Sequence, residues 1–533
     1  MIILAIKDLM IKKYDNYKVY IHNLSRFDGI FLLKILANLG ECNPIIHDDK
    51  IISISFKYKD YDITFKDSQQ MLNVSLRSLG KSFGVDVLKG YFPYDFVNKD
   101  NLDYIGIIPD FKYFVNISHD EYDGITSYNW NLKNEAIKYC ENDCISLYQI
   151  ILKFNELIFE QFKINIHKYP TLSSLAFAIY RSSFIENDLI PQLSGQIEKD
   201  IRQSYTGGAV DMYIPENKEN NNVYAYDVNS LYPSVMNNSD MPIGKPTLFE
   251  GNIRNFNKDA FGFFYCKVVT PEFLDHPIIQ THIKTEDGIR SVAPLGTWSD
   301  MIFSEEMDNA TKYGYKFEIL WGYTFERKNI FKDYVNTLYK LRLEYPKSDP
   351  LNLIAKLLLN SLYGRFGMID SFPTIEIVNN NDVLDIIDEF KNDEIKNIIE
   401  LGNKSMIIYR THQANINTML DGNKQTHNVS IAIASAITAY ARIHMSQFKN
   451  NPDYKLFYSD TDSIYIDKPL HEDLINSKVL GLMKLECTLI DAIFLSPKMY
   501  YLETIEGKNI YKIYNFSWKK ELNLYFTVMN GKF

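Results

Sequence analysis

The chain has 533 residues, 46% of them hydrophobic, which is enough for about three to four domains or subdomains with packed interiors. Its 5 cysteines contain no C-x-x-C pair, which argues against a disulfide framework or a zinc knuckle and favours a reducing compartment. No apolar run reaches the roughly 18 residues of a membrane span, so we expect no membrane partner. The first residues carry neither a secretion signal nor a transit peptide, so a protein that works in an organelle would be made there.

The formal net charge of −10 argues against a nucleic-acid partner, but the charges are segregated along the chain. Residues 327–365 carry eight Lys or Arg against three Asp or Glu, whereas residues 381–400 carry two against seven. A basic segment in an acidic protein fits a phosphate-facing groove, and it fits a solvated helix face equally well.

Residues 19–36 predict an apolar strand, a polar turn at His22 and Asn23, and a helix that begins near Asp28. The position of Asp28 suits a helix cap and also suits a metal ligand at a strand end.

A second helix is predicted over residues 136–151, with Cys140 and Cys144 as buried apolar thiols. The predicted buried stripe consists of Ile137, Cys140, Cys144, Leu147 and Ile151. Tyr139 and Asp143 are four residues apart and share a face, where they either orient a water near a metal or form an ordinary exposed pair.

The middle of the chain carries two turn-forming segments. Residues 205–209 (Tyr-Thr-Gly-Gly-Ala) predict a tight turn where the backbone comes close to another group. Residues 223–234 predict a strand that ends at Asp227, followed by a turn that Pro233 converts into the first turn of a helix. A carboxylate at a rigid strand end suits metal ligation.

A helix is predicted to start at Asp349 and Pro350, an N-cap followed by a proline, and to end at Gly364. Its predicted buried stripe is Leu351, Ile354, Ala355, Leu358 and Leu362. A second stripe carries Asn352, Lys356, Asn360 and Tyr363. That stripe suits a triphosphate, a polar ring edge and a flat base, with a solvated face as the alternative.

Residues 455–466 predict a β-hairpin, because apolar residues alternate on both sides of a short polar tip. Asp460 and Asp462 lie two apart at that tip and project to one side of an extended backbone. Two neighbouring carboxylates fit a divalent cation site, and Asp, Ser and Thr also fit an ordinary polar turn.

Taken together, these segments resemble a family-B DNA polymerase, specifically the protein-primed branch of linear and mitochondrial plasmids and some phages. Six motifs occur in the order of that family and cover nearly the whole chain. They are Tyr205-x-Gly207-Gly208, the palm motif Asp227 to Ser234, the fingers motif Lys356 to Gly364, Thr438 to Arg442, the palm motif Tyr458 to Ser463, and Lys498-x-Tyr500.

The resemblance implies an α+β, right-hand polymerase with palm, fingers and a partial thumb, and an N-terminal, incomplete RNase H-like 3′-5′ exonuclease domain. The implied ranges are 1–195 for the exonuclease-like domain, 196–250 for the first part of the palm, 251–330 for palm and a first family-specific insertion, 331–368 for the fingers, 369–425 for a second insertion, 426–500 for the second part of the palm and 501–533 for a truncated thumb.

The resemblance also implies the site residues. Asp227 and Asp460 would hold two Mg²⁺ ions, with Asp462 beside them and the Val228 carbonyl completing the ligands. The implied nucleotide-binding residues are Ser230, Leu231, Tyr232, Arg342, Lys356, Asn360 and Tyr363. Lys356 neutralises the triphosphate, Tyr363 packs on the new base pair, and Tyr232 excludes a 2′-hydroxyl. The implied DNA-binding residues are Tyr205, Gly207, Gly208, Thr438, Arg442, Lys498 and Tyr500.

The exonuclease motifs are incomplete. The residues that resemble them are Asn23, Phe27, Asp28, Lys89, Tyr139 and Asp143. The first exonuclease motif has no counterpart before His22, so we expect little or no proofreading. Few residues follow Tyr500, so the chain reads as truncated at both ends, either a fragment or a decaying gene.

The sequence therefore predicts a DNA-directed DNA polymerase, a nucleotidyltransferase whose partners are template and primer DNA, dNTPs and a terminal priming protein. The expected location is the mitochondrion, with the cytoplasm as the alternative. Two other functions stay open, a non-catalytic relic that only binds nucleic acid and a polymerase that makes or copies RNA. The element that is copied and the identity of the priming protein do not follow from the sequence.

Overall fold

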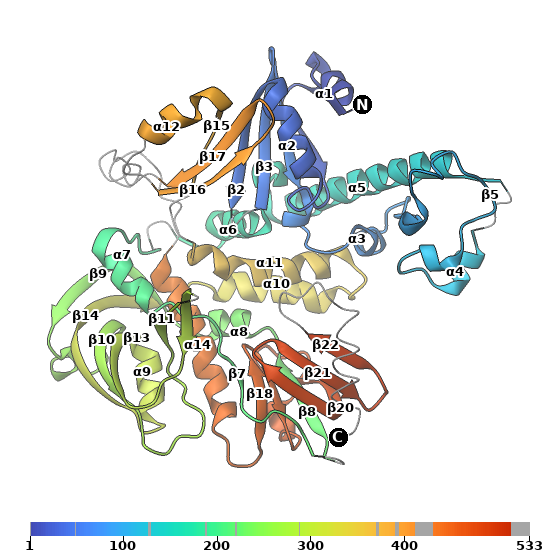
Figure 1. Cartoon of the computed structure of the whole chain (residues 1–533). Helices are drawn as coiled ribbons and strands as arrows, with labels where there is room; N and C mark the ends of the chain where they lie inside the picture. The colour runs from blue at the N-terminus through green and yellow to red at the C-terminus, as the bar shows by residue number, and fades with distance from the viewer. Residues whose placement is uncertain are drawn as a thin grey trace. The chain divides into compact units, whose positions relative to one another are not determined.

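The computed structural model describes residues 2–512, apart from gaps at 48–49, 126–128, 187–188, 219–220, 287, 369–372, 390–393 and 411–429 (Figure 1). The chain divides into two compact units. The first comprises Met1–Ser183, Thr337–Arg365 and Ile369–His427, and the second comprises Phe184–Asn336, Phe366–Met368 and Asn428–Phe533. Helices and strands alternate in both, which confirms the predicted mixed class.

The N-terminal sheet of the first unit has four strands in the order β1-β4-β3-β2. Their bounds are β1 (Tyr17–Ile21), β2 (Glu41–His47), β3 (Lys50–Tyr58) and β4 (Tyr61–Asp67). In this sheet only β1 and β4 run parallel. Their register pairs Ile21, the last residue of β1, with Asp67, the last residue of β4. Helix α2 (Asp28–Leu39) buries Leu33 and Leu36 against this sheet, so the strand and helix predicted over residues 19–36 are confirmed.

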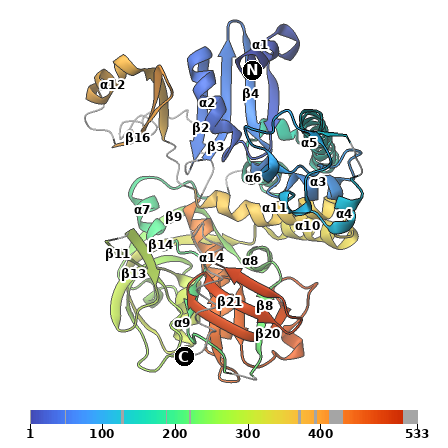
Figure 2. The same ribbon diagram turned by 45° about the vertical axis from the view of Figure 1, so that its right-hand side comes forward.

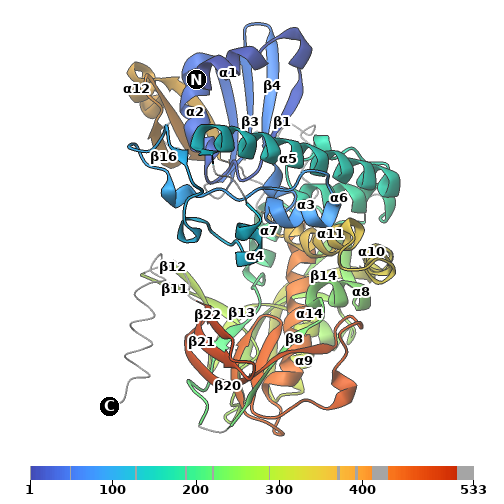
Figure 3. The same cartoon turned by 90° about the vertical axis from the view of Figure 1, so that its right-hand side faces the viewer.

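Helix α5 (Leu132–Phe162) is the long helix in teal that runs across the sheet in Figure 3. Its buried residues are Leu132, Ser146, Ile150, Ile151, Phe154 and Ile158. The predicted stripe is wrong in its first half, since Ile137 is 49% exposed and both Cys140 and Cys144 are exposed thiols. The physical reason is that α3 (Leu76–Phe83) packs on α5 further along, where Phe83 meets Phe154 edge to face.

Part of the predicted second insertion packs on the N-terminal sheet. Strands β15 (Thr374–Asn379), β16 (Glu394–Glu400) and β17 (Lys404–Arg410) form a sheet in the order β15-β17-β16, with α12 (Val383–Glu389) beside it (Figure 2). Met406 and Ile408 join the same hydrophobic core as Leu36. The remainder of that predicted insertion, residues 411–425, lies outside the described residues.

Helix α11 (Pro350–Phe366) follows α10 (Lys332–Glu344). The Asp349 carboxylate accepts from the Leu351 amide, which confirms the predicted N-cap. All members of the predicted buried stripe are buried, namely Leu351, Ile354, Ala355, Leu358 and Leu362. The helix continues two residues beyond the predicted end because Phe366 is fully buried and packs on Phe331.

The second unit is built on a seven-stranded sheet in the order β22-β21-β20-β8-β19-β18-β7. The bounds are β7 (Val210–Met212), β8 (Val223–Val228), β18 (Leu456–Asp460), β19 (Ser463–Ile466), β20 (Met483–Ser496), β21 (Met499–Thr504) and β22 (Asn509–Lys512). The hairpin predicted over residues 455–466 is confirmed. Residues 501–512 complete this sheet rather than a separate thumb, and residues 513–533 lie outside the described residues.

A second sheet of this unit has the order β13-β10-β14-β9, and helix α14 (Ile431–Lys449) lies between the two sheets (Figures 1 and 2). The strands are β9 (Met241–Glu250), β10 (Gly262–Val269), β13 (Thr297–Phe303) and β14 (Lys316–Lys328). Around α14 pack α7 (Gly195–Gln203), α8 (Leu231–Asn238) and α9 (Ser304–Thr311). Because both sheets cover α14, it is buried on nearly every face.

The smaller elements are α1 (Ile2–Leu9), α4 (His119–Asp123), α6 (Leu172–Ser183), β5 (Ile105–Gly106), β6 (Trp130–Asn131), β11 (Thr281–Thr285) and β12 (Gly288–Val292). Among the described helices, none combines the length and the apolar character that crossing a bilayer requires.

Candidate active site

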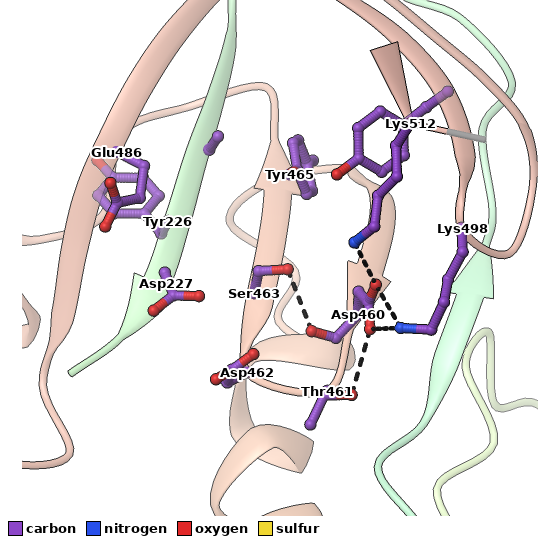
Figure 4. A pocket seen from close by; sticks show the side chains of 12 residues that line it. Tyr226, Asp227, Asp460, Thr461, Asp462, Ser463, Tyr465, Glu486, Lys498 and Lys512 are labelled. Atoms are coloured by element: carbon purple, nitrogen blue, oxygen red, sulfur yellow. Dashed lines mark hydrogen bonds and ion pairs between the residues drawn. The ribbon is translucent and has the colours of Figure 1, made fainter. Parts of the chain in front are cut away.

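A cavity of about 420 Å³ opens at one end of the seven-stranded sheet (Figure 4). Its charged lining residues are Asp227, Asp460, Asp462, Glu486, Lys498 and Lys512. Four acids against two lysines leave a formal charge of −2. The three predicted carboxylates from distant parts of the chain thus line one cavity, with an excess of negative charge.

The strand register explains how Asp227 and Asp460 reach the same cavity. Ser463 on β19 pairs with Asp227 on β8 and with Asp460 on β18. Side chains of directly paired residues lie on the same face of a sheet, so both carboxylates project from one face with Ser463 between them. Asp462 lies in the two-residue turn, where its carbonyl accepts from the Val228 amide at 2.8 Å.

Asp460 is held by two ammonium groups. Lys498 Nζ lies 2.7 Å and 2.9 Å from its two carboxylate oxygens, and Lys512 Nζ lies 3.4 Å from one of them (Figure 4). Burial opposes ionisation of Asp460, but the hydrogen bond and charge of Lys498, together with Lys512, hold its pKa below the ordinary value. Two lysines thus balance the charge of Asp460 in this structure, and the metal pair of Asp227 and Asp460 stays a prediction.

Asp227 and Asp462 have the opposite electrostatics. Burial and the nearby charges of Asp462 and Glu486 raise the pKa of Asp227 to about 7. Burial and then Asp460 raise the pKa of Asp462. Carboxylates whose ionisation is disfavoured by neighbours of the same charge fit a site that a cation would neutralise.

The segment after Asp227 is rigidly held. Asn229 donates from its side chain to the carbonyls of Ser477 and Val479, and Ser230 adopts a left-handed backbone with φ of 57°. Pro233 lies in the first turn of α8, as predicted. Leu231 is 1% exposed as a whole residue, whereas Tyr232 is half-buried, and the nucleotide contacts predicted for both stay predictions.

The turn over residues 205–209 touches the hairpin of β18 and β19. The Thr461 amide donates to the Ala209 carbonyl at 2.9 Å. A Cβ on Gly208 would lie 2.5 Å from Thr461 Cγ2, whereas a Cβ on Gly207 would meet nothing within 4 Å. The predicted close approach is therefore confirmed for Gly208, and the exposed Gly207 faces open space.

Thr438 and Arg442 lie inside the protein rather than on a DNA-facing surface. They are 2% and 8% exposed, because α14 is covered by both sheets. The Arg442 guanidinium binds Glu306 and the carbonyls of Thr206 and Gly207. The prediction of direct DNA contact by these two side chains does not fit this burial, and Arg442 instead holds the turn at Thr206–Gly207.

Lys498 and Tyr500 occupy the wall of the cavity. The Lys498 amide donates to the Tyr458 hydroxyl at 2.8 Å, and Tyr500 packs edge to face on Tyr458. Tyr458 also stacks on Phe494 with ring centroids 4.9 Å apart. This aromatic cluster fixes the backbone from which Lys498 reaches Asp460.

The predicted fingers residues belong to the first unit. Lys356 and Asn360 are exposed on one face of α11, with Tyr363 half-buried one turn further along. Asn352, on the same predicted stripe, has a structural role, because its amide donates to the carbonyls of Arg342 and Tyr345. Arg342 lies on α10, with its guanidinium over the Tyr339 ring.

Among the exonuclease-like residues of the first unit, Lys89, Tyr139 and Asp143 are in mutual contact. Lys89 Nζ lies 2.7 Å from the Asp143 carboxylate and over the Tyr139 ring. Asn23 has a left-handed backbone, and its amide donates to Asp67, which is fully buried. Phe27, next to Asp28, is 63% exposed.

Four residues of these sites escaped the sequence reasoning, namely Asp67, Glu306, Glu486 and Lys512. Each is a single charged residue without a distinctive local pattern. Lys484 pairs with Asp227 in the strand register and lies 2.6 Å from Glu486 two residues further along β20, and this i, i+2 spacing of charges on a strand is a weak local signal.

Comparison with known proteins shows which family this chain resembles. Residues 8–454 match the family model described as DNA polymerase type B, organellar and viral. The sequence named "Probable DNA polymerase" from Neurospora intermedia is 39% identical over 93% of this chain and 52% of its own length. The DNA polymerase of Streptococcus phage Cp-1 is 24% identical over 92% of this chain and 78% of its own length.

Among solved structures, phi29 DNA polymerase with primer-template DNA and incoming nucleotides matches with a TM-score of 0.69. The sequence identity is 20%, over 99% of this chain and 88% of that chain, so the likeness shows the fold. The chain spans about half the length of the curated fungal relatives that it matches. The predicted right-hand polymerase fold is confirmed, and the chain belongs to the organellar and viral family of type B DNA polymerases.

Proposed function

We propose that this chain is a DNA-directed DNA polymerase that adds deoxynucleotides to a primer 3′-hydroxyl under the direction of a template. The observation that carries the proposal is the acidic cavity in which Asp227 and Asp462 meet beside an Asp460 neutralised by two lysines. The relatives are named DNA polymerases, and the phi29 enzyme was solved with primer-template DNA and incoming nucleotides.

The acidic half of the cavity suits magnesium. Mg²⁺ is commonly held by one or two carboxylates together with waters and substrate phosphates, which fits Asp227 and Asp462. In the part of the chain that the structure describes, no group of three or more His, Cys, Asp or Glu is arranged for a metal, so substrate oxygens and the Val228 carbonyl would have to complete the ligand set. Two bound Mg²⁺ ions would lower the pKa of the primer hydroxyl and stabilise the departing pyrophosphate.

The protein's own side chains then hold the substrates. The primer hydroxyl releases its proton, and its O3′ bonds to the α-phosphorus of the incoming nucleotide. The α–β phosphoanhydride bond breaks, and pyrophosphate leaves as the second product. Lys498 and Lys512 supply positive charge where primer phosphates are expected, and Asp460 keeps both ammonium groups in place.

The nucleotide roles follow from the resemblance. Lys356 and Arg342 would neutralise the triphosphate, Tyr363 would pack on the new base pair, and Asn360 would contribute to nucleotide binding. Tyr232 would lie under the sugar and exclude a 2′-hydroxyl, which favours deoxynucleotides.

We extend the proposal to weak or absent proofreading. Asp143, the acid of the third exonuclease-like motif, already forms an ion pair with Lys89. A cation would have to compete with that ammonium for the carboxylate.

We also place in this proposal a terminal priming protein as partner and the mitochondrion as location, with the cytoplasm as alternative. The support for the location is the family description, which includes organellar polymerases.

Primer extension tests the function directly. The native chain is expected to extend a primer on a template with Mg²⁺ and dNTPs, and the Asp460→Ala and Asp462→Asn variants are expected to lose most of that activity. Absence of extension by the native chain, with retained binding of primer-template, would instead support a non-catalytic relic. Tyr232→Val is expected to raise incorporation of ribonucleotides by about tenfold, and unchanged sugar selection would remove the gate assignment.

A further inference from the structure

Arg442 holds a turn through four acceptors in the interior of the second unit. Its Nε and Nη2 donate to the two carboxylate oxygens of Glu306 at 2.7 Å and 2.8 Å. Its Nη1 donates to the carbonyls of Thr206 and Gly207 at 2.5 Å and 3.2 Å. Both members of the ion pair are buried, with side chains 6% and 8% exposed.

A second buried cation on α14 holds the strand that follows the turn. Lys449 is seven residues after Arg442, two helical turns along the same face. Its ammonium, on a side chain 7% exposed, lies 3.7 Å from Asp211 on β7. Helix α14 therefore holds the turn through the carbonyls of Thr206 and Gly207, and it holds the strand after the turn through Asp211.

The turn is in direct contact with the catalytic hairpin. The Thr461 amide donates to the Ala209 carbonyl, and Val210 pairs with Asp460 in the strand register. Gly208 allows Thr461 to approach so closely that a Cβ would not fit. A shift of the turn therefore moves the backbone of Asp460 and Thr461.

We propose that Glu306 is a positioning residue for nucleotide addition, which acts through Arg442 on the Thr206–Gly208 turn and through that turn on the Asp460–Thr461 end of the hairpin. The inference rests on the proposed polymerase function. A carboxylate is needed at position 306 because it binds the guanidinium in two places and fixes the direction of the remaining N–H groups toward the carbonyls. Without it, Arg442 keeps a buried charge with no counter-ion and the turn loses its fixed donor.

The test compares Glu306→Gln with Glu305→Gln. The neighbouring Glu305 lies on the same helix, with its carboxylate 3.8 Å from Arg327 on the partly exposed side. Glu306→Gln is expected to lower kcat/KM for primer extension by about tenfold while far-UV circular dichroism stays native, and Glu305→Gln is expected to stay within about twofold of native. If Glu306→Gln does not fold, Glu306→Asp, which keeps the charge and shortens the reach, is measured in its place.

Two readouts separate positioning from general destabilisation. Hydrogen exchange by mass spectrometry is expected to accelerate in Glu306→Gln over residues 205–211 and 458–462 and not elsewhere in the second unit. In the double variant Glu306→Gln/Arg442→Gln, the loss of kcat/KM is expected to be no greater than in the worse single variant, because both act through one contact. Native kcat/KM in Glu306→Gln, uniform acceleration of exchange, or additive losses would each overturn the assignment.

Failure of the proposed function gives a different result. If the native chain does not extend primers, the polymerase proposal fails, and the exchange pattern of Glu306→Gln still decides whether Glu306 fixes the turn and the hairpin.

Discussion

The ammonium of Lys498 lies within hydrogen-bonding distance of both carboxylate oxygens of Asp460, at 2.7 Å and 2.9 Å. This contact divides the acids of the cavity into two kinds. Asp460 is neutralised by the protein itself, whereas burial and neighbouring acids raise the pKa of both Asp227 and Asp462. The division gives the two aspartates of the hairpin different roles.

The first prediction separates those roles. Asp462→Asn is expected to lower kcat for primer extension by about a thousandfold, since it removes one of the two carboxylates that we propose bind the metal. Asp460→Asn is expected to cost about 10- to 100-fold, because it releases Lys498 without removing a ligand. The measurement is kcat as a function of Mg²⁺ concentration. An equal shift of the Mg²⁺ concentration at half-maximal kcat in both variants would show that Asp460 is a metal ligand as well.

The second prediction concerns the two lysines on Asp460. Lys498→Met and Lys512→Met are each expected to weaken primer-template binding and to reduce the magnitude of the salt slope by about one. The effect is expected to be greater for Lys498, whose ammonium makes two short contacts, than for Lys512 at 3.4 Å.

Fluorescence anisotropy over a range of salt concentrations measures this binding. Lys468→Met is the control, because that ammonium binds the Asp453 carbonyl on the exposed surface. If Lys498→Met leaves the salt dependence of binding unchanged, Lys498 does not contact a primer or template phosphate.

The third prediction uses the adjacent glycines of the turn. Gly208→Ala is expected to lower kcat about tenfold and to reduce the melting temperature, because the new Cβ would lie 2.5 Å from Thr461 Cγ2 and displace the hairpin. Gly207→Ala is the matched control and is expected to behave as native, since nothing lies within 4 Å of its Cβ position. Partial recovery in Gly208→Ala/Thr461→Gly would assign the loss to this clash, and equal losses in both single variants would refute it.

The fourth prediction is a pH dependence in the metal-free protein. With a pKa of about 7 in the folded state, Asp227 holds its proton more tightly than in the unfolded chain. The protonated Asp227 therefore contributes its full share to the free energy of unfolding below the ordinary aspartate pKa. That contribution is lost as the pH rises toward and through 7.

Asp227→Asn removes this titration. The melting temperature of the variant minus that of the native chain is expected to grow from pH 5 to pH 8 in the presence of a chelator. Added Mg²⁺ at pH 8 is expected to stabilise the native chain and not the variant. A difference that is independent of pH would show that Asp227 ionises normally.

Much of the architecture followed from local patterns. The alternation around Asp460 predicted the β-hairpin, and the spacing of Leu351, Ile354, Leu358 and Leu362 predicted the buried face of α11. Such patterns succeed because strand and helix periods determine which side chains share a face before any tertiary contact forms. The exposed thiols of Cys140 and Cys144 show the limit, since which part of α5 is buried depends on where α3 packs.

By itself the sequence determined which segments carry carboxylates, lysines and close turns, and in which order they occur. Only the tertiary structure decided which charges meet, since Lys498 is 38 residues and Lys512 is 52 residues from Asp460 along the chain. It also decided that Arg442 is buried against Glu306 rather than exposed. The physical reason is that ion pairs across sheet strands and between helices depend on strand register and burial, which no local period encodes.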